Sequence, residues 1–162
     1  MAVFHVDASY ISKGKSAGGG SRFAAYVERR DPDHATQHAR YLARDGKGQE
    51  DLVVSGSAFL PQWAKNSEDF WLCADRYERQ RGVVARVYQF TLPRELSPEG
   101  QLALAEDLRA VFFAGYPQTW AIHNPPAHDQ SGDNPHLHIM FSTRREEERA
   151  PRGAKEWFAQ AA

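Results

Sequence analysis

The sequence predicts one α+β domain, in which five β-strands form a sheet and three or four helices pack on it. The chain has 162 residues, 41% of them hydrophobic and 25% charged, as is usual in globular domains. Apolar runs that end at proline or glycine alternate with amphipathic helical segments, but without a regular βαβ repeat. This order favours α+β over a doubly wound fold. We treat residues 1–162 as a single domain, because this length supports one core and is too short for two.

The strands are predicted from β-branched and aromatic runs bounded by turn residues. They cover residues 2–9, 51–60, 83–92, 119–123 and 136–142. Pro61 and Pro93 end the second and third of these runs, because proline cannot donate a hydrogen bond to a sheet. The glycine-rich segment 11–21 is predicted to be a loop.

The helices are predicted from apolar residues that recur every three or four positions. They cover residues 21–30, 67–81 and 97–115, with a further helical patch within 31–50. The helix 97–115 has the clearest signals, with Ser97 as N-cap, Pro98 in its first turn and Gly115 as its end. The tail begins a helix and then stops, so we expect the chain to be the N-terminal part of a longer protein.

The composition excludes several classes of protein. Cys73 is the only cysteine, so neither an internal disulfide nor a cysteine zinc site is expected. No apolar run approaches the roughly 18 residues of a membrane span, and the first residues do not resemble a secretory signal. We therefore expect a cytoplasmic protein. The net charge is −1, yet residues 1–47 contain eight basic and five acidic residues, a local charge of +3 that suits phosphate groups.

Three histidines occupy strand positions that face the same way. Side chains alternate along a strand, so His136 and His138 share one face, while Leu137, Ile139 and Phe141 share the other, which we expect to be the core side. His123 ends the preceding strand. If the two strands pair, three imidazoles converge, and three neutral imidazoles suit a divalent ion such as Zn, Mn, Co or Ni. A single strand histidine usually only packs, so the prediction depends on all three together.

His34 and His38 also share a face, within the helical stretch "HATQH". The glutamate of a metalloprotease motif is absent, because Ala35 takes its place. We therefore expect both histidines to lie on the surface.

A metal ion beside a basic face favours phosphate chemistry, in which the ion neutralises charge on a phosphoryl oxygen. No serine or cysteine motif offers a nucleophile, and tyrosine is an option, because its oxygen can attack phosphorus and form a covalent phosphodiester link. Tyr26, Tyr41 and Tyr10 are the candidates. Packing explains the other three better: Tyr77, Tyr88 and Tyr116.

The stretches "AIHNP" and "NPHLHIM" resemble the histidine motif of HUH endonucleases. The whole chain is similar to the N-terminal relaxase domain of plasmid mobilization proteins of the MobA/MobL family. The similarity extends over "MAVFHVDASYISKGKSA", "AAYVERR", "FWLCADRYERQRG", "FTLPRELSPEGQLALAEDLR", "GDNPHLHIMFSTR" and "EWF", in the order of the family.

This resemblance implies an antiparallel five-stranded sheet, a catalytic Tyr26, and His123, His136 and His138 as ligands of a divalent ion (Mn, Mg, Zn, Co or Ni). It implies an enzyme that nicks one strand at an origin of transfer and keeps a 5′-phosphotyrosine link. Such enzymes act in the bacterial cytoplasm with relaxosome accessory proteins. They then travel with the strand to a recipient cell through a type IV secretion channel and its coupling protein.

One position departs from the family, whose strand before "LPREL" often carries a glutamate. Gln89 occupies this strand and can hydrogen-bond a histidine, but it is not a carboxylate base. Asp7, on the first strand, is the substitute that we consider for accepting the tyrosine proton, and ionisation assisted by the metal is the other option.

We expect the single DNA strand to contact basic side chains, chiefly in the first third of the chain. These are Lys13, Lys15, Arg22, Arg29, Arg30, Arg40 and Arg44, with Arg144 at the rim of the metal strand. Two other functions stay open: a rolling-circle replication initiator of the HUH class, and a catalytically idle module that binds metal or DNA. The order of motifs favours a relaxase, because Tyr26 precedes the histidines.

Overall fold

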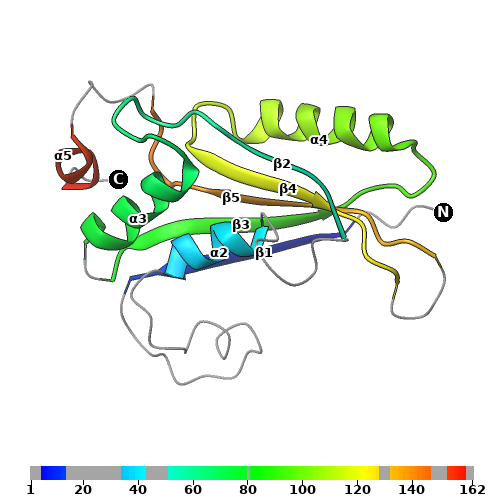
Figure 1. Cartoon of the computed structure of the whole chain (residues 1–162), viewed down its shortest axis with the longest axis horizontal. Coiled ribbons are helices and arrows are strands. Elements are labelled where there is room, and N and C mark those ends of the chain that lie inside the picture. Colours follow the sequence, from blue (N-terminus) through cyan, green and yellow to red (C-terminus); the bar gives the residue numbers. More distant parts are fainter. Residues whose placement is uncertain are drawn as a thin grey trace, which may run out of the picture.

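The structure is a computed structural model that describes residues 5–13, 34–42, 51–79, 81–127, 132–146 and 153–159, without the side chains of His34, Gln37 and Tyr41. Its strands form one antiparallel sheet in the order β1–β3–β5–β4–β2 (Figure 1). The strands are β1 (Val6–Ser12), β2 (Leu52–Ala58), β3 (Val83–Thr91), β4 (Gln118–His123) and β5 (His136–Phe141). The predicted α+β class and the five strands are confirmed.

Helices cover both faces of this sheet (Figure 1). They are α2 (His34–Leu42), α3 (Ser67–Tyr77), α4 (Pro98–Phe112) and α5 (Ala154–Ala159). Helices α2, α3 and α5 share one hydrophobic cluster with β3, β4 and β5, whereas α4 packs on the opposite face. Within the described residues, no helix is long and apolar enough to cross a membrane.

Both faces of the central strands are covered, so every residue of β4 and β5 is buried. On the α4 face, Leu137 and Ile139 pack in a cluster with Phe113. On the other face, Met140 packs under the aromatic side chains of α3 and α5, which include Trp71 and Trp157. The expected core face of Leu137, Ile139 and Phe141 is confirmed, and the histidine face is buried as well, because α2, α3 and α5 cover it.

Several boundaries differ from the sequence prediction, among them the ends of β1 and α3. Strand β1 runs to Ser12, because Ile11 and Ser12 pair with β3 instead of starting the loop. Helix α3 ends at Tyr77, four residues earlier than expected, because Glu78 has an extended backbone with ψ 142°. The helix predicted over 21–30 lies outside the described residues.

A buried carboxylate fixes α2 against α3. Asp75 accepts hydrogen bonds from the backbone N–H groups of Ala35 and Thr36, both at 3.0 Å, and from the Thr36 hydroxyl at 2.9 Å. A negative charge at a helix N-terminus also interacts favourably with the helix dipole. The position of α2 over the sheet therefore depends on a side chain from α3.

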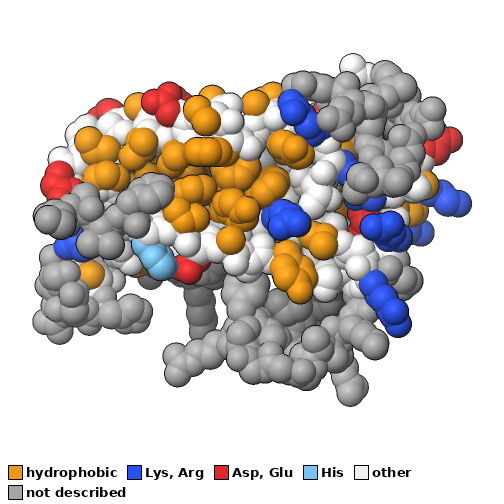
Figure 2. Space-filling view, turned by 180° about the vertical axis from the view of Figure 1, so that it is seen from behind, with side chains coloured by type: hydrophobic (Ala, Val, Ile, Leu, Met, Phe, Trp, Pro, Cys, Tyr) orange, Lys and Arg blue, Asp and Glu red, His pale blue; other side chains and the backbone are white. Residues whose placement is uncertain are grey.

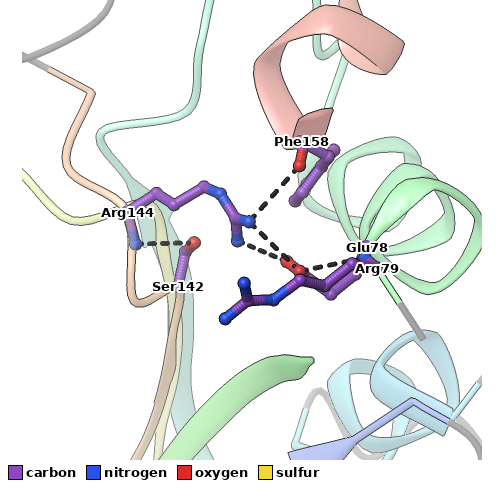
Figure 3. Close-up of polar contacts among 5 residues, drawn as sticks. All are labelled: Glu78, Arg79, Ser142, Arg144 and Phe158. Atoms are coloured by element: carbon purple, nitrogen blue, oxygen red, sulfur yellow. Dashed lines mark hydrogen bonds and ion pairs between the residues drawn. The ribbon is translucent and has the colours of Figure 1, made fainter. Parts of the chain in front are cut away.

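An ion pair fixes the end of α3 to the segment after β5. The guanidinium of Arg144 binds both carboxylate oxygens of Glu78, and it also donates to the Phe158 carbonyl at 3.3 Å (Figure 3). The two side chains are only 3% and 2% exposed. The expectation of Arg144 as a DNA contact at the rim is therefore corrected: its charge is buried and joins α3 to α5.

His38 is 6% exposed, so the expectation of a surface residue is wrong. It lies on the same side of α2 as Ala35 and Leu42, which pack in the core. Burial lowers its pKa from 6.5 to about 4, because desolvation disfavours the charged ring. His38 is therefore neutral in the folded protein near pH 7.

On the side of the molecule opposite α2 and α3, hydrophobic side chains gather on the surface (Figure 2). Tyr10 and Val6 of β1 are 63% and 40% exposed, and Phe112 at the end of α4 is 61% exposed. The register places Val6 beside Phe90 and Tyr10 beside Arg86, so this part of β1 extends the α4 face of the sheet.

Removing one partner of the Glu78–Arg144 pair should destabilise the fold strongly. Arg144→Ala leaves a buried carboxylate without its counter-charge, which costs about 3–5 kcal/mol in the free energy of unfolding. Urea denaturation measures this. The matched control is Arg40→Ala, which breaks an ion pair between half-exposed side chains and should cost at most about 1 kcal/mol. Equal losses in the two variants would contradict the structural role of Arg144.

Acid should destabilise the protein through His38. Its folded pKa lies below its unfolded pKa, so the unfolded state takes up a proton that the folded state excludes. Stability from this group is complete above pH 6.5 and falls as the pH drops from 6.5 towards 4, by up to about 3 kcal/mol. Urea unfolding with a chelator present should give His38→Leu a smaller loss over this range than wild type. Identical pH profiles would contradict the burial of a neutral imidazole.

Candidate metal centre

Strands β4 and β5 bring the three predicted histidines together. His123 lies directly opposite His136 in the register, and His138 lies two residues further along the same face of β5. Ring centroids are 4.7–5.6 Å apart, and the candidate ligand atoms lie within 4.8 Å of one another. All three side chains are buried. The predicted pairing of the two strands and the shared face are confirmed.

Backbone carbonyls set the orientation of two of the rings. The Leu42 carbonyl, at the end of α2, lies 2.8 Å from Nε2 of His123, and the Asn134 carbonyl lies 2.8 Å from Nδ1 of His136. A carbonyl only accepts, so each of these ring nitrogens carries the hydrogen. In the neutral ring the lone pair is then on Nδ1 of His123 and on Nε2 of His136.

This donor set fits a divalent cation. Metal-bound imidazoles characteristically donate their other ring N–H to a carbonyl or carboxylate, which fixes the tautomer and the ring plane. The carbonyls of Leu42 and Asn134 occupy that position here. Three imidazoles occur in catalytic zinc sites, which keep further positions open for water or substrate. No local sequence pattern indicates Leu42, because it lies 81 residues from its partner.

Gln89 and Asp7 lie in one row across the sheet with His138. Gln89 of β3 is opposite His138, and Asp7 of β1 is opposite Gln89. Residues opposite one another project from the same face, so both candidates face the side of the metal centre. Gln89 is the direct neighbour of a ligand, whereas the Asp7 carboxylate is one strand further away and its side chain is 69% exposed.

His5 belongs to the same face and was missed by the sequence analysis. Its Nε2 lies 3.2 Å from a carboxylate oxygen of Asp7, and its side chain is 65% exposed. The signal was present, because His5 and Asp7 have the same i, i+2 spacing as His136 and His138. An imidazole beside an aspartate is a group that can take up and pass on protons.

Three of the described tyrosines lie on the face of the sheet opposite the histidines. Tyr10 pairs with Arg86 on the α4 face, opposite to the histidines, so it cannot reach them from β1. Tyr88 and Tyr116 also contact Phe141 on that face, with ring centroids 5.5 and 6.0 Å away. Tyr26 lies outside the described residues, and the Tyr41 side chain is not described.

Of the predicted DNA contacts, the structure describes three side chains. Lys13 donates to the Arg76 carbonyl at 2.5 Å, Arg40 pairs with Glu68 near the surface, and Arg144 is buried as described above. The other candidates lie outside the described residues: Lys15, Arg22, Arg29, Arg30 and Arg44.

Comparisons with solved structures support the fold. The chain superimposes on a chain from "Molecular Basis of Vancomycin Resistance Transfer in Staphylococcus aureus" with a TM-score of 0.58 and 21% sequence identity, over 88% of this chain and 71% of that one. At this identity the match concerns the fold alone.

Similar sequences are mobilization and transfer proteins. The chain is 40% identical to the "43 kDa relaxation protein" of Salmonella typhimurium over 116 residues, which cover 68% of this chain and 31% of that protein. It is 32% identical to "Mobilization protein A" of Escherichia coli over 98% of this chain and 20% of that protein. "Conjugal transfer protein TraA" of Rhizobium radiobacter is 28% identical over 89% of this chain and 14% of that protein. The chain thus spans less than a third of the length of these relatives.

The family model that matches is the MobA/MobL family, over residues 22–159. This range includes Tyr26 and all three histidines, and it covers most of the chain. The chain therefore belongs to the MobA/MobL family.

Proposed function

We propose that this chain is the DNA-nicking domain of a conjugative relaxase, which cleaves one strand at an origin of transfer with Tyr26 as nucleophile. The observation that carries the proposal is the convergence of three buried histidines with defined tautomers, in a chain of the MobA/MobL family. A divalent ion held there, whether Mn, Mg, Zn, Co or Ni, would polarise the scissile phosphate and neutralise its developing charge.

The proposed step is a transesterification. The Tyr26 oxygen attacks the phosphorus, a new P–O bond forms to tyrosine, and the bond to the 3′ oxygen breaks. The phenol proton passes to a base, and the leaving oxygen takes up a proton to give a free 3′-OH. No water is consumed in breaking the phosphodiester, so the reverse reaction rejoins the strand in a recipient cell.

The remaining residues hold the site and move the proton. The carbonyls of Leu42 and Asn134 keep two rings aimed at the centre. Gln89 lies beside His138 and can orient it through its amide, but it cannot act as a base. We propose that Asp7, with His5 beside it, accepts the tyrosine proton through water.

The tyrosine assignment is supported by elimination as well as by resemblance. Of the candidates in the sequence, Tyr10 projects from the wrong face of the sheet, which leaves Tyr26 and Tyr41. Tyr26 stands in the stretch "AAYVERR" that resembles the family, among Arg22, Arg29 and Arg30. Basic side chains at that place would favour a phosphate and a phenolate.

The substrate follows from the same proposal. The first 47 residues carry the +3 local charge, and Lys13 and Arg40 belong to this segment, as do Lys15, Arg22, Arg29, Arg30 and Arg44. We propose that these side chains contact the phosphates of a single strand at the origin of transfer. Relaxosome accessory proteins and a type IV coupling protein would be the protein partners. The nicking reaction would occur in the cytoplasm of the donor bacterium, before the protein travels with its strand.

A rolling-circle replication initiator of the HUH class is the main alternative, and an idle module that binds metal or DNA is the second. The position of Tyr26 before the histidines favours the relaxase over the initiator. The ordered ring tautomers favour a module that binds a metal over one that binds DNA alone.

Tyr26→Phe should abolish formation of a covalent DNA adduct. Wild-type protein, Mn²⁺ and a supercoiled plasmid that carries the native gene with its flanking DNA should give a nicked plasmid with protein on the 5′ end. Gel electrophoresis in SDS detects the adduct, protease treatment removes it and leaves the nicked plasmid, and sequencing maps the nick. Tyr10→Phe is the matched control and should keep full activity, because Tyr10 lies on the opposite face. An adduct that survives Tyr26→Phe would rule out this nucleophile.

Metal binding should depend on the three histidines and not on His5. Calorimetry with Mn²⁺ or Zn²⁺ should give one site per chain, and His136→Ala should weaken it by at least about 100-fold, because two imidazoles hold a metal far less tightly than three. At 100 times Kd the ion should stabilise the fold by about 2.7 kcal/mol. His5→Ala should bind as tightly as wild type. Unchanged affinity in His136→Ala would contradict the metal centre.

A further inference from the structure

A pocket of about 270 Å³, separate from the histidine cluster, opens between β2, α2 and the start of α3. Six of its eight lining residues are polar or charged, and they supply four hydroxyl groups and one pair of opposite charges. These side chains are Ser55, Ser57, Ser67, Thr119, Arg40 and Glu68. Of these, only Arg40 has a part in the proposed function, as a phosphate contact, and the bond-breaking step uses none of them.

The pocket lies on the same face of the sheet as the metal centre. Ser55 is opposite Ala121 in the register, and Ala121 is opposite His138. Two strand spacings separate Ser55 from His138 along this row, a distance of about 10 Å. Helix α2 connects the two places, because Arg40 lines the pocket and the Leu42 carbonyl holds His123.

Hydrogen bonds hold two hydroxyl groups of the pocket in place. Thr119 is 6% exposed, and its hydroxyl accepts a 2.8 Å hydrogen bond from the indole N–H of Trp71. The same hydroxyl lies 2.5 Å from that of Ser67. These contacts fix two hydroxyl oxygens, so a ligand would meet groups that are already ordered.

The charges favour a ligand with both donors and acceptors. Arg40 and Glu68 bind one another at the mouth of the pocket, each about half exposed, so they carry no net charge. A phosphate only accepts hydrogen bonds and would be repelled by the Glu68 carboxylate. The edge of a nucleobase offers donors and acceptors together, which hydroxyl, guanidinium and carboxylate groups can match.

The lining also indicates how a base would be held. None of the residues that line the pocket is aromatic, so binding by stacking is not available there. The volume is just below the roughly 300 Å³ at which pockets for drug-sized ligands begin, which suits a single base. Recognition would depend on hydrogen bonds to the base edge, and such contacts discriminate between bases.

We propose that this pocket binds one unpaired base of the DNA strand, a few nucleotides from the cleaved phosphate, and selects its identity. The proposal rests on the proposed function, because it takes the strand at the metal centre as the ligand. It adds a site on β2 and α3 that selects the DNA sequence and is separate from the residues that take part in strand cleavage.

The test uses an oligonucleotide that spans the mapped nick, together with copies that each lack one base. Fluorescence anisotropy measures the affinity of wild type, of Ser57→Leu, which fills the pocket, and of Ser55→Ala with Ser57→Ala, which removes two hydroxyls. Ala8→Leu adds the same bulk to an exposed strand position on the other face and is the matched control. Thermal melting and Mn²⁺ calorimetry verify the fold and the metal centre of each variant.

Wild type should bind about tenfold more weakly when the base is missing at one position of the oligonucleotide, or at either of two adjacent positions. This is the size of effect expected when specific contacts to a base are lost. Ser57→Leu and the double alanine variant should bind the intact oligonucleotide about tenfold more weakly. Their affinity should no longer fall further when the base at that position is missing. Ala8→Leu should keep the wild-type profile.

If both pocket variants respond to the missing bases as wild type does, the base pocket is overturned. The proposed function stands in that case, provided that wild type still forms its DNA adduct. If wild type neither binds the strand nor forms an adduct, the proposed function fails and the base pocket fails with it.

Discussion

The antiparallel register between β4 and β5 is the constraint on which the site depends. It places His123 opposite His136 and leaves His138 beside both. A shift by one residue would turn His136 and His138 towards α4 and would bring Leu137 into the place of a ligand. Burial on both faces prevents that shift, because Leu137 and Ile139 pack with Phe113 on one side while Met140 packs under α3 on the other. The same packing that stabilises the sheet therefore also brings the three histidines of the candidate metal centre together.

The helices also determine the orientation of the histidine rings. The ring of His123 takes its orientation from the carbonyl at the end of α2, and α2 is fixed at its start by the Asp75 carboxylate of α3. Helix α3 is fixed in turn by the buried pair of Glu78 with Arg144. The ligand geometry thus depends on contacts far from the metal centre. Changes in the α3 packing should therefore appear as changes in metal affinity as well as in stability.

The parts predicted from sequence are those that local patterns determine. Alternation along a strand is a two-residue property, so it identified the shared face of His136 and His138. The order of strand and helix segments indicated the α+β class. Contacts over long separations were missed, since no local pattern encodes them. Leu42 meets His123 across 81 residues, and Arg144 meets Glu78 across 66. His38 looked like a surface residue in a polar helix, and only the packing of α2 on α3 and the sheet buries it.

The central claim is that the three imidazoles bind one divalent ion with tautomers set by the backbone. Two-dimensional NMR of the imidazole nitrogens in protein loaded with diamagnetic Zn²⁺ tests this claim most directly. The structure predicts that His123 coordinates through Nδ1 with its hydrogen on Nε2, and that His136 coordinates through Nε2 with its hydrogen on Nδ1. Coordination of His123 through Nε2, or nitrogen signals that do not respond to Zn²⁺, would contradict it.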